Sequence, residues 1–371
     1  MATDQQNLNY NPNAAADPQA GIFGLPYSFD DAKVIYLPVP WEATTSYGGG
    51  TSHGPEAILN ASSQMDVFDL DVKNPYLAGL HAHAISPEMF ELNRRSKILA
   101  QTIIEAYGEI DHLPALQKNL DLVNAASATL NHFVRQEVST IFQAKKIPGL
   151  IGGDHSTPFG AFQAAAENYP EYGILHFDAH SDTRKAYLGF EHSHASIMYN
   201  AATKIPQIKK IVQVGIRDFC EEEYQFTSSQ KDKFQVYYDQ QLSAKKMDGK
   251  SFASIAEEIV SKLPDHVWVS FDIDGLDPRY CPHTGTPVPG GLDYHEAIQI
   301  VRSLAKSGKK IIGFDVVEVA PTLDSQSNPI EVNQANDEWD ANVGMRLLYK
   351  LSAFALASQK ICAWNSDHNS I

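Results

Sequence analysis

Seven short apolar segments, mostly continuous rather than alternating in polarity, constrain the fold of this chain more than any other feature. They are rich in Val and Ile and cover residues 33–38, 147–151, 173–177, 211–216, 234–238, 267–273 and 310–319. A continuous apolar run of this length is typical of a strand that is buried on both faces, as strands are in parallel sheets. The segments therefore predict a mainly parallel central sheet.

Stretches with apolar residues three and four positions apart lie between these strands and predict helices. They cover residues 91–112, 116–144, 158–168, 295–306 and 342–357. We expect Ser156 or Thr157 to cap the third of these helices, because Pro158 fits its first turn. Strands that alternate with helices predict an α/β fold with three layers, α/β/α.

Length alone would suggest two domains, but α/β folds often run to ~250 residues or more as one unit. The chain has 371 residues, of which 43% are hydrophobic, so it can bury a sizeable core. Without a repeat or a convincing linker, we expect one domain over residues 31–371 after a polar N-terminal arm, residues 1–30. The arm lacks the basic and apolar regions of a signal peptide. No segment approaches ~18 uninterrupted apolar residues, so no membrane span is expected.

Charge and cysteine content narrow the partners and the compartment. The chain carries 29 basic and 45 acidic residues, a net charge of −16, which disfavours nucleic acid and anionic lipid as partners. A small cation would suit this surface better. Cys220, Cys281 and Cys362 are widely spaced, which excludes a disulfide scaffold and indicates a reducing compartment, so we expect the cytoplasm.

Acidic residues and histidines follow four of the predicted strands, where each strand ends. They are Asp154 and His155 after 147–151, Asp178, His180 and Asp182 after 173–177, Asp272 and Asp274 at the end of 267–273, and Asp315 and Glu318 in 310–319. Open α/β sheets bind ligands outside the carboxyl ends of their strands. We therefore expect these side chains to meet at one edge of the sheet.

The alternation within two of these runs predicts a metal site. Asp178, His180 and Asp182 share one face of an extended backbone, and Asp272 and Asp274 do likewise. Buried together without cations, such groups would repel and have to protonate. Mixed nitrogen and oxygen ligands suit Mn, Fe, Ni or Zn better than Ca. One such motif alone is also compatible with a solvated surface loop, but two motifs at strand ends favour metal.

These motifs resemble the ureohydrolases, the family of arginase, agmatinase, guanidinobutyrase, guanidine hydrolase and formimidoylglutamase. The resemblance runs from about residue 34 to residue 351. It covers Gly152 to Ser156, Asp178 to Asp182, Ser270 to Asp274, and the Thr284-Gly285-Thr286-Pro287 turn. It implies an arginase-like fold, two divalent metal ions, Mn²⁺ or Ni²⁺, and a homo-oligomer, a trimer or hexamer.

The resemblance also implies roles for individual residues. One metal ion would be held by His155, Asp178, Asp182 and Asp272, and the other by His180, Asp178, Asp272 and Asp274, so that Asp178 and Asp272 bridge the pair. Glu318 would pair with a substrate guanidinium, and Thr286 would lie near the substrate. His194 would relay protons or contact the substrate, with His192 as the alternative match. A salt-bridged surface glutamate at 318 and a purely structural turn at 286 are the alternative interpretations.

The charges of such a site fit hydrolysis of a guanidinium. Four ligand carboxylates balance two divalent ions, and a bridging hydroxide leaves one negative charge. Metal coordination lowers the pKa of water to ~7 and supplies the strong nucleophile that a guanidinium carbon requires. We therefore predict a hydrolase that cleaves a C–N bond of a small guanidino compound and releases urea.

The substrate is less constrained. Residues 183–187 do not follow the asparagine-rich loop of arginases, whereas residues 40–42 and 338–344 resemble the agmatinase branch, which includes guanidine hydrolases. We expect guanidine ahead of agmatine. Arg184 could instead bind a carboxylate group of the substrate, which would fit formimidoylglutamase, guanidinobutyrase or another guanidino-acid hydrolase. A solvated Arg184 on the surface is the favoured interpretation. A zinc-dependent deacetylase with one metal ion and a non-catalytic binding protein are the remaining alternatives.

Overall fold

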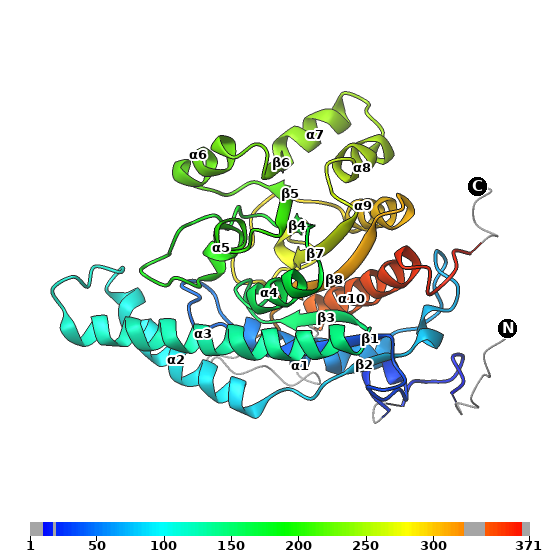
Figure 1. Cartoon of the computed structure of the whole chain (residues 1–371), viewed down its shortest axis with the longest axis horizontal. Coiled ribbons are helices and arrows are strands. Elements are labelled where there is room, and N and C mark those ends of the chain that lie inside the picture. Colours follow the sequence, from blue (N-terminus) through cyan, green and yellow to red (C-terminus); the bar gives the residue numbers. More distant parts are fainter. Residues whose placement is uncertain (1–9, 18–19, 323–337, 366–371) are drawn as a thin grey trace.

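A single parallel sheet forms the centre of the protein (Figure 1). The computed structural model describes residues 10–17, 20–322 and 338–365. The sheet order is β2-β1-β3-β8-β7-β4-β5-β6. The strands are β1 (Val34–Val39), β2 (Leu80–Ala82), β3 (Ile147–Gly152), β4 (Tyr172–Phe177), β5 (Ile208–Ile216), β6 (Phe234–Tyr238), β7 (His266–Asp272) and β8 (Lys310–Val317). All seven predicted strands form. β2 was not predicted, because three residues at the edge of the sheet are too few to give an apolar pattern.

Helices cover both faces of the sheet. They are α1 (Gly54–Ala61), α2 (Pro87–Glu105), α3 (Pro114–Gln143), α4 (Phe159–Asn168), α5 (Ile197–Lys204), α6 (Glu221–Ser229), α7 (Asp239–Met247), α8 (Phe252–Val260), α9 (Tyr294–Lys306) and α10 (Trp339–Ser358). One apolar cluster joins the sheet to α1, α8, α9 and α10, and another joins it to α3, α4 and α5. The three-layer prediction is therefore confirmed.

Two predictions about the helices need correction. The helix predicted to reach residue 112 ends at Glu105, because Tyr107 and Gly108 both have positive φ. α4 begins at Phe159 without a side-chain cap, so the predicted cap at Ser156 or Thr157 is wrong. Both hydroxyls bond Asp154 instead: Thr157 Oγ1 donates to its carbonyl and Ser156 Oγ to its carboxylate. The unpredicted helices α1 and α5–α8 have only eight or nine residues, too few for a clear period.

The hairpin of α2 and α3 supports one loop of the candidate site. Its far end forms a separate apolar cluster with Phe190, which is fully buried. Gly108, after α2, approaches Leu188 so closely that a Cβ there would lie 3.0 Å from its Cα. The hairpin thus holds residues 188–190, just before the segment that carries His192 and His194.

The predicted N-terminal arm is described only in part. Residues 1–9 and 18–19 of it lie outside the described residues. Phe23 is fully buried, and its ring lies 5.2 Å from that of Tyr349 and 6.2 Å from that of Tyr36. The end of the arm therefore packs on the core. Within the described ranges, no helix has both the length and the hydropathy that a membrane span requires.

Candidate metal centre and substrate pocket

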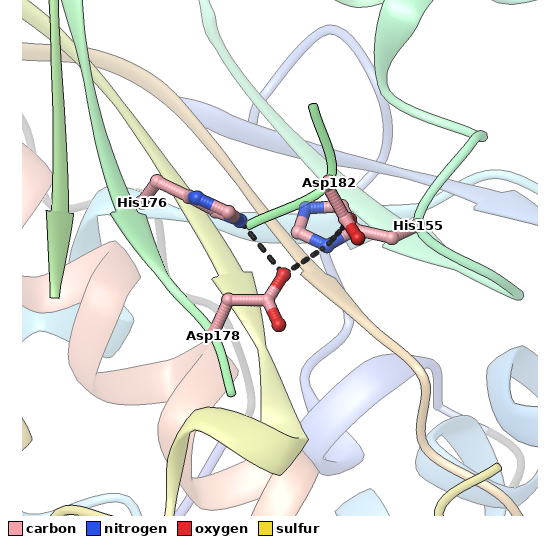
Figure 2. A group of neighbouring side chains, drawn as sticks. All are labelled: His155, His176, Asp178 and Asp182. Atoms are coloured by element: carbon pink, nitrogen blue, oxygen red, sulfur yellow. Dashed lines mark hydrogen bonds and ion pairs between the residues drawn. The ribbon is translucent and has the colours of Figure 1, made fainter. Parts of the chain in front are cut away.

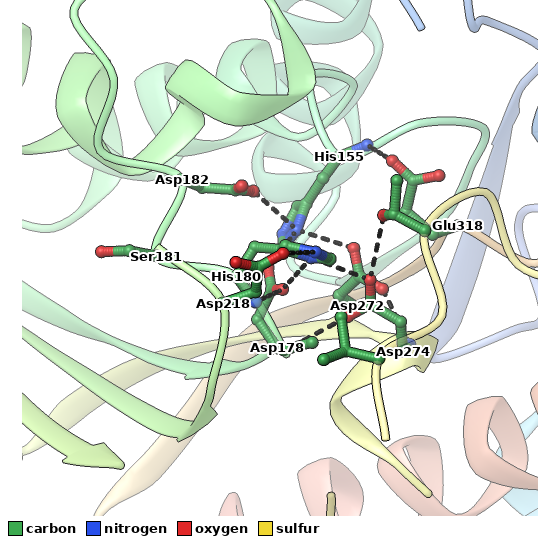
Figure 3. Close-up of polar contacts among 12 residues, drawn as sticks. His155, Asp178, His180, Ser181, Asp182, Asp218, Asp272, Asp274 and Glu318 are labelled. Atoms are coloured by element: carbon green, nitrogen blue, oxygen red, sulfur yellow. Dashed lines mark hydrogen bonds and ion pairs between the residues drawn. The ribbon is translucent and has the colours of Figure 1, made fainter. Parts of the chain in front are cut away.

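Four adjacent strands bring the predicted ligands together. β3, β8, β7 and β4 are neighbours in the sheet, and their carboxyl ends lead to His155, Glu318, Asp272 and Asp178. Figure 3 shows these side chains converging with those of His180, Asp182 and Asp274. Parallel strands present their carboxyl ends at one edge, which is why segments more than 160 residues apart meet here, as His155 and Glu318 do.

His155 points one ring nitrogen at three carboxylates. Its Nδ1 lies 3.0 Å from Asp178 Oδ2, 3.3 Å from Asp182 Oδ2 and 3.2 Å from Asp272 Oδ2. All four side chains are buried. A single nitrogen cannot donate to three acceptors, so this convergence fits four ligands around one cation.

The other nitrogen of His155 explains its orientation. Nε2 lies 2.9 Å from Ser270 Oγ, and that hydroxyl donates its one hydrogen to Asp315 Oδ1 at 2.9 Å. Ser270 must therefore accept from Nε2–H, so in the neutral imidazole, the form that binds a metal ion, the Nδ1 lone pair faces the carboxylates. Metal-bound histidines commonly use this arrangement.

A second convergence lies beside the first and shares Asp178. His180 Nδ1 lies 3.0 Å from Asp274 Oδ2 and 3.4 Å from Asp178 Oδ1. The two oxygens of Asp178 thus face different histidines, as a bridging ligand requires. Asp272 faces His155 through Oδ2, while its Oδ1 accepts the Asp274 N–H at 2.8 Å, so its bridging role stays a prediction.

The raised pKa values of two buried carboxylates in this cluster are consistent with a site for cations. Burial raises the pKa of Asp182 well above its usual value, and repulsion by Asp178 adds to this effect. Burial likewise raises the pKa of Asp272, with repulsion by Asp274 and Asp178. Two divalent cations would keep such carboxylates ionised, and the donor set of imidazoles and carboxylates fits Mn²⁺ or Ni²⁺.

Glu318 is buried beside this cluster in a restrained backbone conformation. Its φ is 62°, and its N–H donates to Gly153 O at 2.7 Å. Thr284 Oγ1 donates to its carbonyl at 2.8 Å, and its own Oε1 accepts the His155 N–H at 2.9 Å. Only 5% of the side chain is exposed, so Glu318 is not a surface salt bridge. A left-handed non-glycine residue costs energy and is frequent at functional sites.

The structure separates the two candidate histidines. His194 Nδ1 lies 3.4 Å from Glu318 Oε1. Burial lowers the pKa of His194, but its hydrogen bond to Glu318 and the nearby negative charges outweigh that effect and raise the pKa overall. The His192 ring instead lies 5.0 Å from that of Phe159, and burial lowers its pKa to about 4. His194 therefore faces the cluster and His192 does not contact it.

A pocket of about 110 Å³ opens onto the cluster. It is lined by His180, Asp182, Arg184, His194, Ala195, Asp218, Phe219, Glu223, Asp272, Asp274, Thr286 and Glu318. Thr286 Oγ1 is 3.5 Å from Asp274 Oδ2, and Arg184 Nε is 3.7 Å from Glu223 Oε2. A larger cavity of about 730 Å³ beside α9 and α10 is lined by none of these residues. The smaller pocket is therefore the candidate substrate site.

His176 is a member of the cluster that the sequence analysis missed. It is fully buried on β4, and its Nε2 lies 2.8 Å from Asp178 Oδ2 (Figure 2). The sequence did carry a signal for it, since His176 lies two residues before Asp178 and residues two apart in extended backbone share one face.

Arg217 is a second residue that the sequence did not point to. Its guanidinium donates to the carbonyls of Asp274 and Val288, at 2.8 Å each, and so joins the turn after β7 to the turn that carries Thr286.

Comparison with known proteins agrees with this geometry. The model of the Arginase family matches residues 32–336. An N(1)-aminopropylagmatine ureohydrolase of Synechocystis sp. is 29% identical over 300 residues, which are 80% of this chain and 85% of that protein. An agmatinase of Bacillus cereus is 28% identical over 309 residues, 83% of this chain and 90% of that protein.

Solved structures share the fold. The agmatine ureohydrolase of Thermoplasma volcanium superposes with a TM-score of 0.65 at 22% identity, over 90% of this chain and 94% of that one. The proclavaminate amidino hydrolase of Streptomyces clavuligerus gives the same TM-score and identity, over 94% and 96%. With a family model that spans most of its length, the chain belongs to the arginase family of ureohydrolases.

Proposed function

We propose that this protein is a binuclear metal hydrolase that cleaves a C–N bond of a small guanidino compound and releases urea. The carrying observation is the double convergence of imidazoles and carboxylates, with Asp178 between His155 and His180. The proposed ligand sets are His155, Asp178, Asp182 and Asp272 for one ion, and His180, Asp178, Asp272 and Asp274 for the other. Bound divalent ions would activate a water molecule as hydroxide near neutral pH.

The protein's own residues would bind and orient the substrate. The Glu318 carboxylate lies beside the cluster and lines the pocket, and a carboxylate pairs with the planar guanidinium through two hydrogen bonds. Thr286 lines the pocket and contributes a hydroxyl. His194, 3.4 Å from Glu318, would hold the proton that the leaving amine takes up.

The small size of the pocket supports free guanidine ahead of agmatine. A volume of about 110 Å³ suits a compact cation better than one with a long amine tail. Because Arg184 lies near Glu223 and above the ring of Tyr187, at 5.1 Å, it is less available for a substrate carboxylate. Agmatine is the second candidate substrate, because a relative of this chain is named agmatinase.

The test is urea release from a panel of guanidino compounds. Guanidine, agmatine, N(1)-aminopropylagmatine, arginine, 4-guanidinobutyrate and formimidoylglutamate would be compared, each with Mn²⁺ and with Ni²⁺. We expect urea from guanidine with the highest kcat/KM. A higher value for agmatine would reverse the order, and two bound ions with no urea from any substrate would contradict the proposal. One zinc ion per chain with amine deacetylation would favour a deacetylase.

Assembly and location complete the proposal. We expect a trimer or hexamer, as family resemblance suggests, which light scattering would measure. The three cysteines are free, which supports a reducing compartment such as the cytoplasm.

A further inference from the structure

We infer that His176 is a positioning residue, which donates a hydrogen bond to Asp178 in a tautomer fixed by Gln213, and not a metal ligand. The inference rests on the proposed function, because it concerns how the metal-binding carboxylate is held. By position alone His176 qualifies as a ligand: it lies with His155, Asp178 and Asp182 in one group whose ligand atoms are all within 4.8 Å (Figure 2).

The orientation of the Gln213 amide is decided by a backbone carbonyl. Gln213 Nε2 lies 2.7 Å from Ser181 O, which can only accept. In the opposite orientation the amide oxygen would face the Ser181 oxygen at this distance, and the two would repel. The nitrogen therefore faces Ser181, although this leaves Oε1 without a partner in the described structure.

The same amide nitrogen fixes the tautomer of His176. Gln213 Nε2 also lies 3.0 Å from His176 Nδ1. An amide nitrogen only donates, so Nδ1 must accept and carries no proton. The ring proton of the neutral imidazole is then on Nε2, the nitrogen that lies 2.8 Å from Asp178 Oδ2. A protonated nitrogen cannot coordinate a cation, so His176 donates to the carboxylate.

His155 and His176 are neighbours, with ring centroids 5.0 Å apart, but they present different nitrogens to the carboxylates. His155 keeps its proton on Nε2, toward Ser270, and presents bare Nδ1 to the carboxylates. His176 accepts at Nδ1 and presents Nε2–H. The donated hydrogen bond orients Asp178 Oδ2, the oxygen that also faces His155. Since Asp178 is shared by both proposed ion sites, His176 should influence both.

Metal titration of the apoprotein tests the inference without relying on activity. His176→Leu removes the donor, whereas His176→Gln retains an amide N–H near the position of Nε2. Partners of metal ligands typically contribute 10–100-fold to metal affinity. We expect calorimetry to show two ions per chain in both variants, bound 10–100-fold more weakly in His176→Leu and less than 10-fold more weakly in His176→Gln. His266→Gln is the matched control, because His266 begins β7, at the opposite end of that strand from Asp272. This variant should bind metal as the wild type does.

Two results would overturn the inference. Unchanged affinity in His176→Leu would remove the positioning role. Loss of one ion per chain from both variants at saturating metal would make His176 a ligand. If His176→Leu does not fold, ¹⁵N NMR of the histidine-labelled apoprotein still decides: the His176 signal, assigned by its loss in His176→Gln, should be that of the Nε2–H tautomer, and an Nδ1–H tautomer would contradict it. Failure of the wild type to bind metal would remove the proposed function instead, while the tautomer still tests the hydrogen bonds.

Discussion

The backbone N–H of His155 donates to the Oε1 of Glu318 at 2.9 Å, which joins the loop that follows β3 directly to the residue after β8. A direct hydrogen bond therefore links a proposed metal ligand to the proposed guanidinium-binding carboxylate. Glu318 is also restrained by its left-handed backbone and by the bond from Thr284 to its carbonyl. The Glu318 carboxylate is thus oriented before any substrate binds, which lowers the entropic cost of substrate binding.

Glu318→Gln should separate substrate binding from metal binding. The amide can still accept the His155 N–H, so we expect two ions per chain by elemental analysis. Loss of the charge opposite a buried guanidinium costs ~3 kcal/mol, so kcat/KM for guanidine should fall by about 100-fold. Glu221→Gln, in the first turn of α6, is the control and should leave both quantities unchanged. A near-normal rate in Glu318→Gln would remove Glu318 from the substrate site.

Asp178→Ala should abolish binding of both ions, because each oxygen of Asp178 faces a different histidine. Asp274→Ala, which removes a proposed ligand on the His180 side only, should leave one ion per chain. Asp248→Ala is the control, because this residue is exposed just after α7 and does not line the pocket. Metal content of the dialysed variants is the measurement, and two ions in Asp178→Ala would contradict the shared ligand.

Substitution of the two neighbouring histidines should have very different effects. His194→Asn removes the group that faces Glu318, and loss of a proton-transfer residue typically lowers the rate 10²–10⁴-fold. His192→Asn should keep kcat within a factor of about three, since His192 packs on Phe159. Steady-state urea release measures both effects, and equal losses in the two variants would argue against the assignment.

The Glu42–Lys97 pair should stabilise the protein in a pH-dependent way. Glu42, in the loop after β1, is buried and accepts from Ser52 N–H at 3.1 Å and forms an ion pair with Lys97 of α2. Burial raises the pKa of Glu42, but Lys97, together with the hydrogen bonds from Ser52 and Thr51, outweighs this effect and leaves the pKa below its usual value. A lowered pKa means that the pair stabilises the folded state above pH ~4.5 and that this contribution is lost as the pH falls through the folded-state pKa.

Lys97→Met should therefore lower the free energy of unfolding by ~2 kcal/mol at pH 7, and by progressively less as the pH falls below ~4.5. Denaturant unfolding at several pH values is the measurement. Arg94→Met is the control on the same helix, because the Arg94–Glu91 pair is exposed and such pairs contribute little. A pH-independent difference for Lys97→Met would show that Glu42 is not the group responsible.

Removal of metal should lower the thermal stability. Ions that bind only the folded state stabilise it by ~2.7 kcal/mol per site at 100 times Kd. We expect chelation to lower Tm and added Mn²⁺ or Ni²⁺ to restore it, with the restored Tm rising with metal concentration. In Asp178→Ala the Tm should no longer respond to metal, so a full response in that variant would place the stabilising ions elsewhere.

The sequence determined the layers and the edge at which the site forms. Continuous apolar runs specify buried parallel strands, and a motif that follows a strand must lie at its carboxyl end, so the meeting of His155, Asp178 and Asp272 was predictable. The strand β2 and the helices α1 and α5–α8 were not, because segments of three to nine residues carry too little periodicity and depend on packing.

Only the tertiary structure decided the contacts between segments that are remote in the chain. Spacing alone could not distinguish His192 from His194, because both occupy one loop and only its path past Phe159 directs one toward Glu318. The proton position of His176, on β4, was not predictable, because nothing local marks its partner Gln213 on β5, 37 residues away. Periodicity reports which face a side chain occupies, whereas proton positions and carboxylate partners depend on atoms that neighbouring strands supply.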